Sequence, residues 1–312
     1  MKNSPTVTKI AGTGLGLSAI VLVLVAVSLF STLSVNAEII HEEKSLYRDI
    51  AVVQNGPRRC MVFNIHIGDR NQTCVDVDDQ EKLVFSYTRM SFAGLLLNPQ
   101  PRRILVAGLG GGSIPMTLTK LFPEAEIDVV EVDQAVVKVA LEYFFFEEND
   151  NMEVHVADAR HFVKRAGLAG EKYDYIVLDA FTGEYIPEHL LTREFLQEVH
   201  EIMTPDAVLV ANTFSTSRFY DHESVTYHNV FGDFFNFKLP TSGNRIIITW
   251  LHPLPGRGQL MARAREAAEA LRRFDVPVLE YPDRLSTAVD WDVSRRVLTD
   301  QFSPSNLLRD FR

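Results

Sequence analysis

Residues 102–133 decide the fold, and they read RRILVAGLGGGSIPMTLTKLFPEAEIDVVEVD. An apolar run leads into Gly108, Gly110 and Gly112; a helical pattern and a second apolar run follow, and the second run ends at Glu131. The order strand, glycine turn, helix, strand and acidic residue is typical of the nucleotide-binding half of a Rossmann-like sheet. The sequence therefore predicts an α/β fold.

The same turn predicts a nucleoside-containing ligand. Glycines let the chain turn sharply and let a ligand approach the backbone, and free N–H groups at the helix start favour electron-rich groups. Glu131 would end the second strand, where its carboxylate can accept both hydroxyls of a ribose. Ser113 fits the dinucleotide pattern only loosely, which favours S-adenosylmethionine or a relative over NAD. The alternative is a glycine turn that only packs helix on strand.

Composition limits the partners. The chain has 312 residues with 46% hydrophobic content, enough for one large domain or two small ones. A formal net charge of −10 argues against nucleic acid and is compatible with a cationic substrate. No cysteine and histidine spacing is typical of a metal site, so we expect no metal.

The N-terminal segment, residues 1–37, predicts a membrane anchor. Ile10 to Ala37 is a run of 28 residues without a charged side chain, long enough to span a bilayer as a single helix. Val35-Asn36-Ala37 resembles a cleavage site, so a cleaved signal peptide is the alternative. Lys2 and Lys9 favour a cytoplasmic N-terminus, but basic residues flank the other end too, so the side of the membrane stays open.

The two cysteines flank a predicted hairpin. Cys60 and Cys74 lie on either side of a turn that includes residues 68–71. A disulfide across the hairpin would suit an oxidising compartment, and two buried free thiols are equally compatible with the sequence.

Alternating patterns and turn residues divide the rest of the chain. Short strands followed by a helix over residues 83–97 predict a small β-rich domain, and an amphipathic surface helix is expected over 260–274. The predicted organisation is a β-rich domain at 38–100, a Rossmann-like domain at 101–255 and a helical extension at 256–312.

Three acids follow three successive strands of the Rossmann-like domain. Strands alternating with helices predict a mainly parallel sheet with helices on both faces, and ligands bind beyond the carboxyl ends of such strands. Glu131, Asp158 and Asp179 each stand at such an end. Any one of them could instead cap a helix. His189, in the loop after Asp179, either touches substrate or only packs.

The order of these motifs resembles a known family. From about Tyr47 to Leu308 the chain is similar to the spermidine synthase-like group, the aminopropyltransferases. The end of the chain, residues 297–304, is similar to a tail seen in membrane-linked members. The motifs that carry the resemblance are Gly108-Leu-Gly-Gly-Gly112, Val130-Glu-Val-Asp133, Ala157-Asp-Ala159 and Tyr173-Asp-Tyr-Ile-Val-Leu-Asp179.

The resemblance implies an S-adenosylmethionine-dependent methyltransferase-type sheet, and it leaves a homodimer open. It also implies roles position by position. The glycine turn at Gly108, Gly110 and Gly112 would lie along the cofactor, and Glu131 would hold the ribose. Asp158 with Ala159 would contact the adenine, and Gln72 would contact the cofactor tail. Tyr87 would contact the amine, and Asp179 would be the catalytic carboxylate.

Two departures concern the acceptor. Family synthases carry Asp-Ser-Ser-Asp-Pro after the fourth strand, whereas this chain has Asp179-Ala-Phe-Thr182-Gly183. Thr182 thus stands where the family has a second, substrate-binding acid. The family motif Tyr-x-Glu is Tyr87-Thr-Arg89 here. Both changes remove a negative charge where a diamine would bind, which argues against putrescine as the acceptor.

The leading prediction is an enzyme that transfers an aminopropyl group from decarboxylated S-adenosylmethionine to a small-molecule amine. The first alternative is methyl transfer from S-adenosylmethionine itself, because the sheet and cofactor motifs would be the same. The second alternative is a membrane-anchored protein that binds a nucleoside without turnover.

Overall fold

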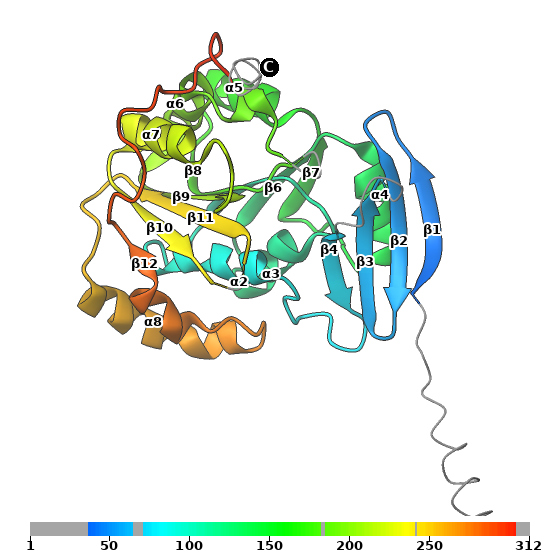
Figure 1. Cartoon of the computed structure of the whole chain (residues 1–312). Helices are drawn as coiled ribbons and strands as arrows, with labels where there is room; N and C mark the ends of the chain where they lie inside the picture. Colours follow the sequence, from blue (N-terminus) through cyan, green and yellow to red (C-terminus); the bar gives the residue numbers. More distant parts are fainter. Residues whose placement is uncertain (1–36, 65–70, 182–184, 241, 304–312) are drawn as a thin grey trace, which may run out of the picture. The chain divides into compact units, whose positions relative to one another are not determined.

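The central sheet of the computed structural model is mixed. In the residues that the structure describes (37–64, 71–181, 185–240 and 242–303) it has eight strands: β5 (Arg103–Ala107), β6 (Glu126–Glu131), β7 (Met152–Val156), β8 (Tyr173–Leu178), β9 (Met203–Phe214), β10 (Phe234–Lys238), β11 (Asn244–Trp250) and β12 (Leu285–Ser286). Their order is β12-β10-β11-β9-β8-β5-β6-β7 (Figure 1). The strands from β9 to β7 pair in parallel, and β9, β11, β10 and β12 pair antiparallel.

Helices cover both faces of this sheet, which confirms the predicted Rossmann-like, methyltransferase-type fold. Their bounds are α2 (Ser86–Ser91), η1 (Phe92–Leu96), α3 (Ser113–Leu121), α4 (Gln134–Tyr143), α5 (Ala159–Ala169), η2 (Glu188–Leu190), α6 (Arg193–Glu201), α7 (Tyr220–Phe231), α8 (Arg257–Arg272) and η3 (Val278–Asp283). Figure 1 shows α5, α6 and α7 above the sheet, and α2, α3 and α8 below it. Each face has its own buried apolar cluster.

The parallel register aligns the carboxyl ends of the inner strands. Ala107 of β5 is paired with Val130 of β6 and with Leu178 of β8, and Leu178 is paired with Ala211 of β9. The residue after each of these partners therefore emerges at the same edge of the sheet. This register requires strands that are apolar on both faces, and all four of these paired residues are buried.

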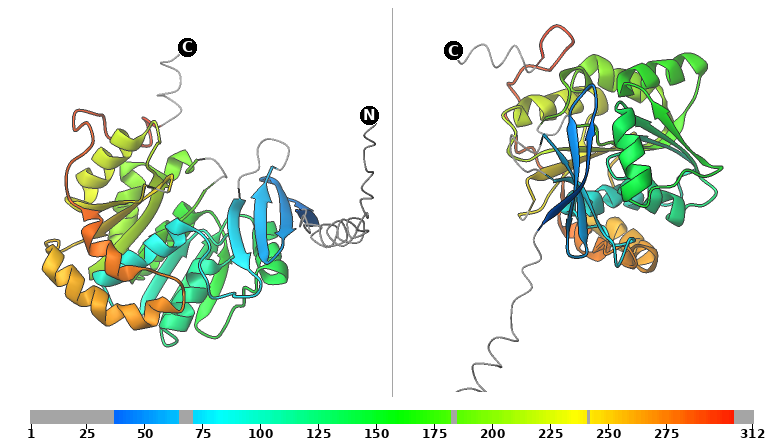
Figure 2. Two further views of the ribbon diagram at one scale, coloured as in Figure 1. Left: turned by 60° about the horizontal axis from the view of Figure 1, so that its bottom comes forward. Right: turned by 90° about the vertical axis from the view of Figure 1, so that its right-hand side faces the viewer.

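A separate four-stranded sheet precedes the central one, as predicted, and is seen edge-on in the right view of Figure 2. Its antiparallel strands are β1 (Glu38–Lys44), β2 (Asp49–Asn55), β3 (Arg58–Phe63) and β4 (Asn71–Asp76), in the order β1-β2-β3-β4. Strand β1 was not predicted, because its sequence EIIHEEK is mostly polar and exposed. Val136 and Val139 of α4 join this sheet to the rest through a cluster with Val52 and Met61.

The two cysteines form a disulfide. Cys60 of β3 and Cys74 of β4 face each other directly in the antiparallel register, with Cα atoms 4.1 Å apart. Of the two alternatives left open by the sequence, the structure therefore has the disulfide. Strand β4 also carries Gln72 and Thr73, so the bond ties the strand that reaches towards the glycine turn to its neighbour.

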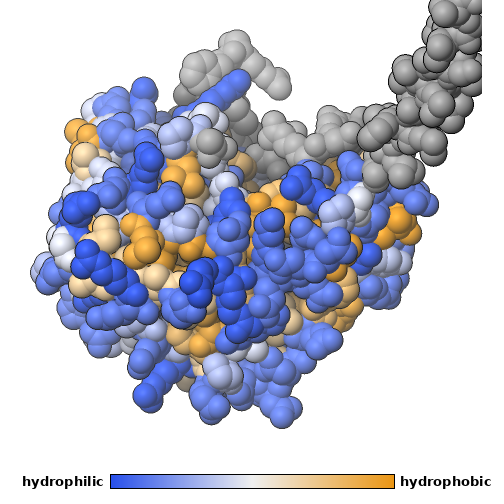
Figure 3. Space-filling view, turned by 90° about the horizontal axis from the view of Figure 1, so that it is seen from below, coloured by the Kyte–Doolittle hydropathy of each residue, from blue (hydrophilic) through white to orange (hydrophobic). Residues whose placement is uncertain are grey.

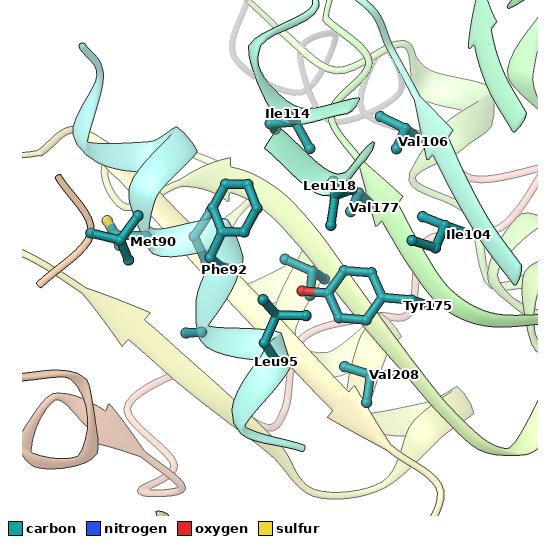
Figure 4. Packing of buried hydrophobic residues seen from close by; sticks show 14 of the residues in the cluster. Met90, Phe92, Leu95, Ile104, Val106, Ile114, Leu118, Tyr175, Val177 and Val208 are labelled. Atoms are coloured by element: carbon teal, nitrogen blue, oxygen red, sulfur yellow. The ribbon is translucent and has the colours of Figure 1, made fainter. Parts of the chain in front are cut away.

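The helix predicted over residues 83–97 is wrong in extent. The structure has the short α2 followed by the 3-10 helix η1. The Tyr175 hydroxyl of β8 donates to the Ser91 carbonyl at the junction, at 3.1 Å. A Cβ on Gly94 would lie 2.5 Å from that same hydroxyl. Figure 4 shows Phe92 and Leu95 packed beside Tyr175, so contact with the sheet, which sequence periodicity does not reveal, sets the break.

The predicted surface helix at 260–274 is confirmed as α8. It buries Leu260, Ala264 and Leu271 against the sheet and leaves most of its polar side chains exposed. Figure 3 views the molecule from the side of α8, and hydrophilic residues dominate this face, with hydrophobic ones in small separate patches. The predicted helical extension is helical only in α8 and η3 among the described residues; from 287 to 303 the chain runs without a helix.

The prediction of a membrane-anchored localisation is corrected. In residues 37–64, 71–181, 185–240 and 242–303, no helix is both long and apolar enough to cross a bilayer. The longest of these helices, α8, has 16 residues and carries charges, whereas a span needs about 20 apolar residues. Residues 1–36, on which the anchor and the signal-peptide alternative rested, lie outside the described residues. An apolar run is necessary for a span but does not establish one.

We predict that the disulfide stabilises the fold measurably. Cys60 and Cys74 are 14 positions apart, and closing a loop of about 15 residues is worth about 3 kcal/mol in the unfolded state. The double substitution Cys60→Ser with Cys74→Ser should lower the free energy of unfolding, measured by urea denaturation, by up to this amount. The wild type in reductant should match the variant. Equal stability of the oxidised wild type and the variant would contradict the bond.

Candidate active site

A cavity of about 270 Å³ opens at the carboxyl ends of β5, β6 and β8. It lies where the parallel register brings the strand ends together, as the sequence predicted. The predicted residues that line it are Gln72, Tyr87, Gly108, Gly110, Glu131, Asp158, Ala159 and Asp179. Two predicted residues are not among them: Gly112 does not line this cavity, and Thr182 lies outside the described residues.

The glycine turn forms one wall of the cavity. A Cβ at Gly108 would lie 2.3 Å from the Asp179 carbonyl oxygen, so only glycine allows β5 and β8 to end this close together. Gly112 serves the turn differently: its φ is +78°, and a Cβ there would meet the Phe146 ring at 2.4 Å. Gly112 therefore sets the start of α3 rather than the cavity surface.

Glu131 is held by backbone donors. Its two carboxylate oxygens accept hydrogen bonds from the Leu109 N–H at 3.1 Å and from the Asp133 N–H at 3.0 Å. Burial raises the pKa of Glu131, although both N–H groups favour the charged form. A carboxylate has about four acceptor positions, so each oxygen can still accept from a ligand hydroxyl. This is the acceptor geometry that a ribose requires.

Asp158 both caps a helix and lines the cavity. One oxygen accepts from the His161 N–H at 3.0 Å and caps α5, and the other lies 2.7 Å from His189 Nε2. Burial opposes ionisation of Asp158, but these two bonds outweigh it and its pKa is lowered. Asp158 can therefore cap the helix and still lie in the cavity wall. His189 also lines the cavity.

Asp179 is a part-buried carboxyl whose pKa is raised to near neutral pH. Burial and the nearby negative charge of Glu131 raise its pKa to about 7, against a hydrogen bond from Asn212 Nδ2 at 2.8 Å that favours the charged form. Burial and the charge of Asp179 in turn raise the pKa of Tyr87. A carboxyl that titrates near pH 7 is suited to general acid and base chemistry.

A second cavity adjoins the first beside Asp179. Gln72, Tyr87 and Phe181 line both cavities. Its remaining wall consists of amides, hydroxyls and aromatic rings, and its described lining residues include no carboxylate. These residues are Asn71, Phe85, Ser86, Asn212, Phe214, Ser242, Gly243 and Asn244. Asp179 lines the first cavity, and its hydrogen-bond partner Asn212 lines the second.

Arg89 lies away from both cavities. Its guanidinium donates to the Leu83 carbonyl at 3.1 Å and pairs with Asp275 at 3.0 Å. It lines neither cavity. The guanidinium of Arg89 therefore places no charge in either cavity, and the prediction that the missing family carboxylate affects amine binding stays a prediction.

Sequence reasoning missed Arg48 and Asn212. Arg48 sits just before β2, lines the first cavity, stacks 4.4 Å from the Phe63 ring centre and donates to the Phe181 carbonyl at 3.3 Å. Nothing in the local pattern indicates these long-range contacts. Asn212 was detectable in principle, since it stands in β9 next to the position paired with the end of β8, one strand over from Asp179.

One group of described residues has the composition of a metal site, but it is remote from the cavities. Ligand atoms of Asp128, Glu153 and His155 lie within 4.8 Å of one another. The oxygens of Asp128 are engaged by His155 at 2.8 Å, Tyr173 at 2.8 Å and Arg103 at 2.9 Å. These hydrogen bonds and ion pairs within the protein account for the group without a metal.

Comparisons with known proteins agree with this geometry. The spermine/spermidine synthase domain model matches residues 84–242, just over half of the 312-residue chain. The polyamine aminopropyltransferase of Vibrio vulnificus is 53% identical over 273 residues, which cover 87% of this chain and 91% of that protein.

Two other likenesses are more limited. The human eEF1A lysine and N-terminal methyltransferase is 34% identical over 150 residues, 43% of this chain and 22% of that protein. The crystal structure of a probable spermidine synthase from Corynebacterium glutamicum matches with a TM-score of 0.63 and 18% identity, over 83% of this chain and 99% of that one, which supports the fold.

The family model and the extent of the Vibrio alignment decide the assignment: the chain belongs to the spermine/spermidine synthase family and is a transferase.

Proposed function

We propose that the two cavities bind a sulfonium donor and an amine acceptor, and that Asp179 is the catalytic base between them. The chain is a polyamine aminopropyltransferase: it moves an aminopropyl group from decarboxylated S-adenosylmethionine to an amine. The observation that carries the residue assignment is the position of Asp179: it lines the first cavity, it accepts a hydrogen bond from Asn212 of the second cavity, and its pKa is raised to about 7.

The first cavity suits the donor. The turn at Gly108 and Gly110 leaves space that a side chain would fill, and Glu131 offers a buried acceptor for ribose hydroxyls. Asp158 and Ala159 line the part assigned to the adenine, and Gln72 the part assigned to the cofactor tail. Two carboxylates facing a cationic donor supply favourable electrostatics in a site that excludes water.

The transfer requires a neutral amine. An alkylammonium has a pKa near 10 and no free lone pair, so it must lose a proton before it attacks. Asp179 accepts that proton. The amine nitrogen then bonds to the carbon next to the sulfonium, the bond from that carbon to sulfur breaks, and its electron pair neutralises the sulfur. After transfer the amine product carries the aminopropyl group, and Asp179 releases its proton to solvent.

The second cavity suits the acceptor. Tyr87 and Phe181 join it to the donor cavity, and the rings of Phe181 and Phe214 lie 5.2 Å apart between centroids. Aromatic faces attract cations, and amide oxygens accept from ammonium groups. We propose Thr182 as a further contact to the acceptor by its place in the sequence alone.

A homodimer and the domain boundaries at 37/38, 100/101 and 255/256 also stay proposals.

Methyl transfer is the second candidate, because the human methyltransferase relative aligns with 43% of this chain. That likeness spans 22% of the relative, and the donor cavity would look the same for both reactions. The aminopropyl reading rests on a relative that aligns over 91% of its length, so it includes the acceptor side.

We predict that the released nucleoside identifies the reaction. Incubation with decarboxylated S-adenosylmethionine and a panel of mono- and diamines should release methylthioadenosine in proportion to the aminopropylated amine, measured by liquid chromatography with mass spectrometry. S-adenosylmethionine should give no adenosylhomocysteine under the same conditions. Adenosylhomocysteine without methylthioadenosine would favour methyl transfer instead.

We predict that Asp179→Asn lowers kcat by roughly 10²- to 10⁴-fold, the usual contribution of a general base. In the wild type, kcat/KM should rise with pH through about 7, because Asp179 with its raised pKa must lose its proton to act. Asp233→Asn, at a side chain that is 83% exposed, is the matched control and should leave kcat unchanged. An Asp179→Asn variant with near wild-type kcat would refute the assignment.

We predict that Glu131→Gln weakens donor binding roughly tenfold or more, because a hydrogen bond to a charged group is worth about 1.5–3 kcal/mol. Isothermal titration calorimetry with methylthioadenosine measures the loss directly, without turnover. The KM for the amine should change little, since Glu131 does not line the second cavity. Unchanged calorimetric affinity would exclude Glu131 from the donor site.

A further inference from the structure

A chain of two side-chain amides ends at Asp179. Asn244 Nδ2 donates to Asn212 Oδ1 at 3.0 Å, and Asn212 Nδ2 donates to Asp179 Oδ1 at 2.8 Å. No role of either asparagine follows from the motifs that the sequence shares with the family. Asn212 is in β9, which pairs in parallel with β8, the strand that precedes Asp179. Asn244 is in β11, which pairs antiparallel with β9.

The strands fix the two amides in place. Asn212 is 4% exposed and stands in β9, and Asn244 begins β11 beside it. Asn212 is paired with Ile246, so Asn244 lies two positions along the neighbouring strand. The Asn244 N–H donates in turn to Ser242 Oγ at 3.1 Å.

The direction of the chain is determined by Asn244. An amide has two ends of nearly equal size, one that donates and one that accepts, and its neighbours decide which way it points. Because Asn244 presents its NH₂ group to Asn212, the Asn212 oxygen must face Asn244. The Asn212 NH₂ group must then face Asp179.

We propose that Asn244 and Asn212 form a positioning relay for the base: Asn244 sets the orientation of the Asn212 amide, and Asn212 holds Asp179 Oδ1, so that Oδ2 is left to take the proton of the acceptor amine. The inference rests on the proposed role of Asp179. It adds two positioning residues: Asn212 bonds to the Asp179 carboxyl, and Asn244 bonds to Asn212.

The other groups around Asp179 make the hydrogen bond from Asn212 decisive for the pKa of Asp179. Glu131 at the end of β6 adds negative charge, and Tyr87 of α2 is a phenol whose own pKa is raised by Asp179. Among the residues that the structure describes, Asn212 is the side chain that donates to Asp179. Without that bond, burial and Glu131 would act unopposed, and the pKa of Asp179 would rise above 7.

The relay therefore has a signature that a simple packing role lacks. Asn212→Leu removes the donor. Asn244→Leu removes the group that holds the Asn212 oxygen and adds no charge near Asp179, so the Asn212 amide is no longer held with its NH₂ group towards Asp179. Both variants should move the acid limb of the kcat/KM profile upward by about one pH unit or more, which lowers activity roughly fivefold at pH 7 and about tenfold well below pH 7, with little loss at pH 9.

The matched control is Asn236→Leu. Asn236 is another buried asparagine of the sheet, 3% exposed, whose bonds go to Tyr220 and Asp290 and which lines neither cavity. It should leave the pH profile in place even if it lowers stability. Thermal denaturation of all variants separates loss of fold from loss of positioning.

A second readout does not depend on turnover. The carboxyl carbon of Asp179 can be titrated by nuclear magnetic resonance in protein labelled at aspartate, with Asp179→Asn to assign the signal. The relay predicts a higher titration midpoint in Asn212→Leu and in Asn244→Leu than in the wild type. An unchanged midpoint in both variants overturns it, as does a loss of activity that is equal at every pH or confined to the KM of the amine.

The two readouts also separate this inference from the proposed function. A wild type that releases no methylthioadenosine would refute aminopropyl transfer, while the carboxyl titration would still decide the relay. An active wild type whose midpoint ignores both substitutions would refute the relay alone.

Discussion

The parallel register of β5 with β6 and β8 is the constraint on which the site depends. It brings Gly108, Glu131 and Asp179 to one edge of the sheet, and the glycine permits a separation that any Cβ would prevent. Loss of water raises the pKa values of both carboxyl groups, and the nearby charge of Glu131 raises that of Asp179 further. The strand pairing that forms the core thus also sets the proton affinity of the base.

The antiparallel half of the sheet completes the site from the other side. Strands β9 and β11 place Asn212 and Asn244 beside Asp179, and the same amides line the cavity assigned to the acceptor. The first sheet adds Gln72 from β4, the strand secured by the disulfide. In the proposed assignment, the donor, the base and the acceptor are therefore held by different parts of the chain.

The sequence predicted the acids because they end strands, and strand ends can be recognised from apolar runs. It predicted the fold for the same reason. It could not predict Arg48, whose contacts with Phe63 and Phe181 join segments far apart in the chain, nor the break between α2 and η1, which follows from contact with Tyr175. It could not show where the Arg89 side chain lies, because its partner Asp275 is far away in the chain. The membrane anchor was inferred from hydropathy alone, which does not establish a span.

The central claim is that the donor and the amine meet at Asp179. A crystal structure with methylthioadenosine and an amine tests it most directly. We expect the ribose hydroxyls within about 3 Å of the Glu131 carboxylate and the amine nitrogen within about 3 Å of Asp179 Oδ2, with Oδ1 still bound to Asn212. An amine bound away from Asp179, or a nucleoside outside the glycine turn, would contradict the account.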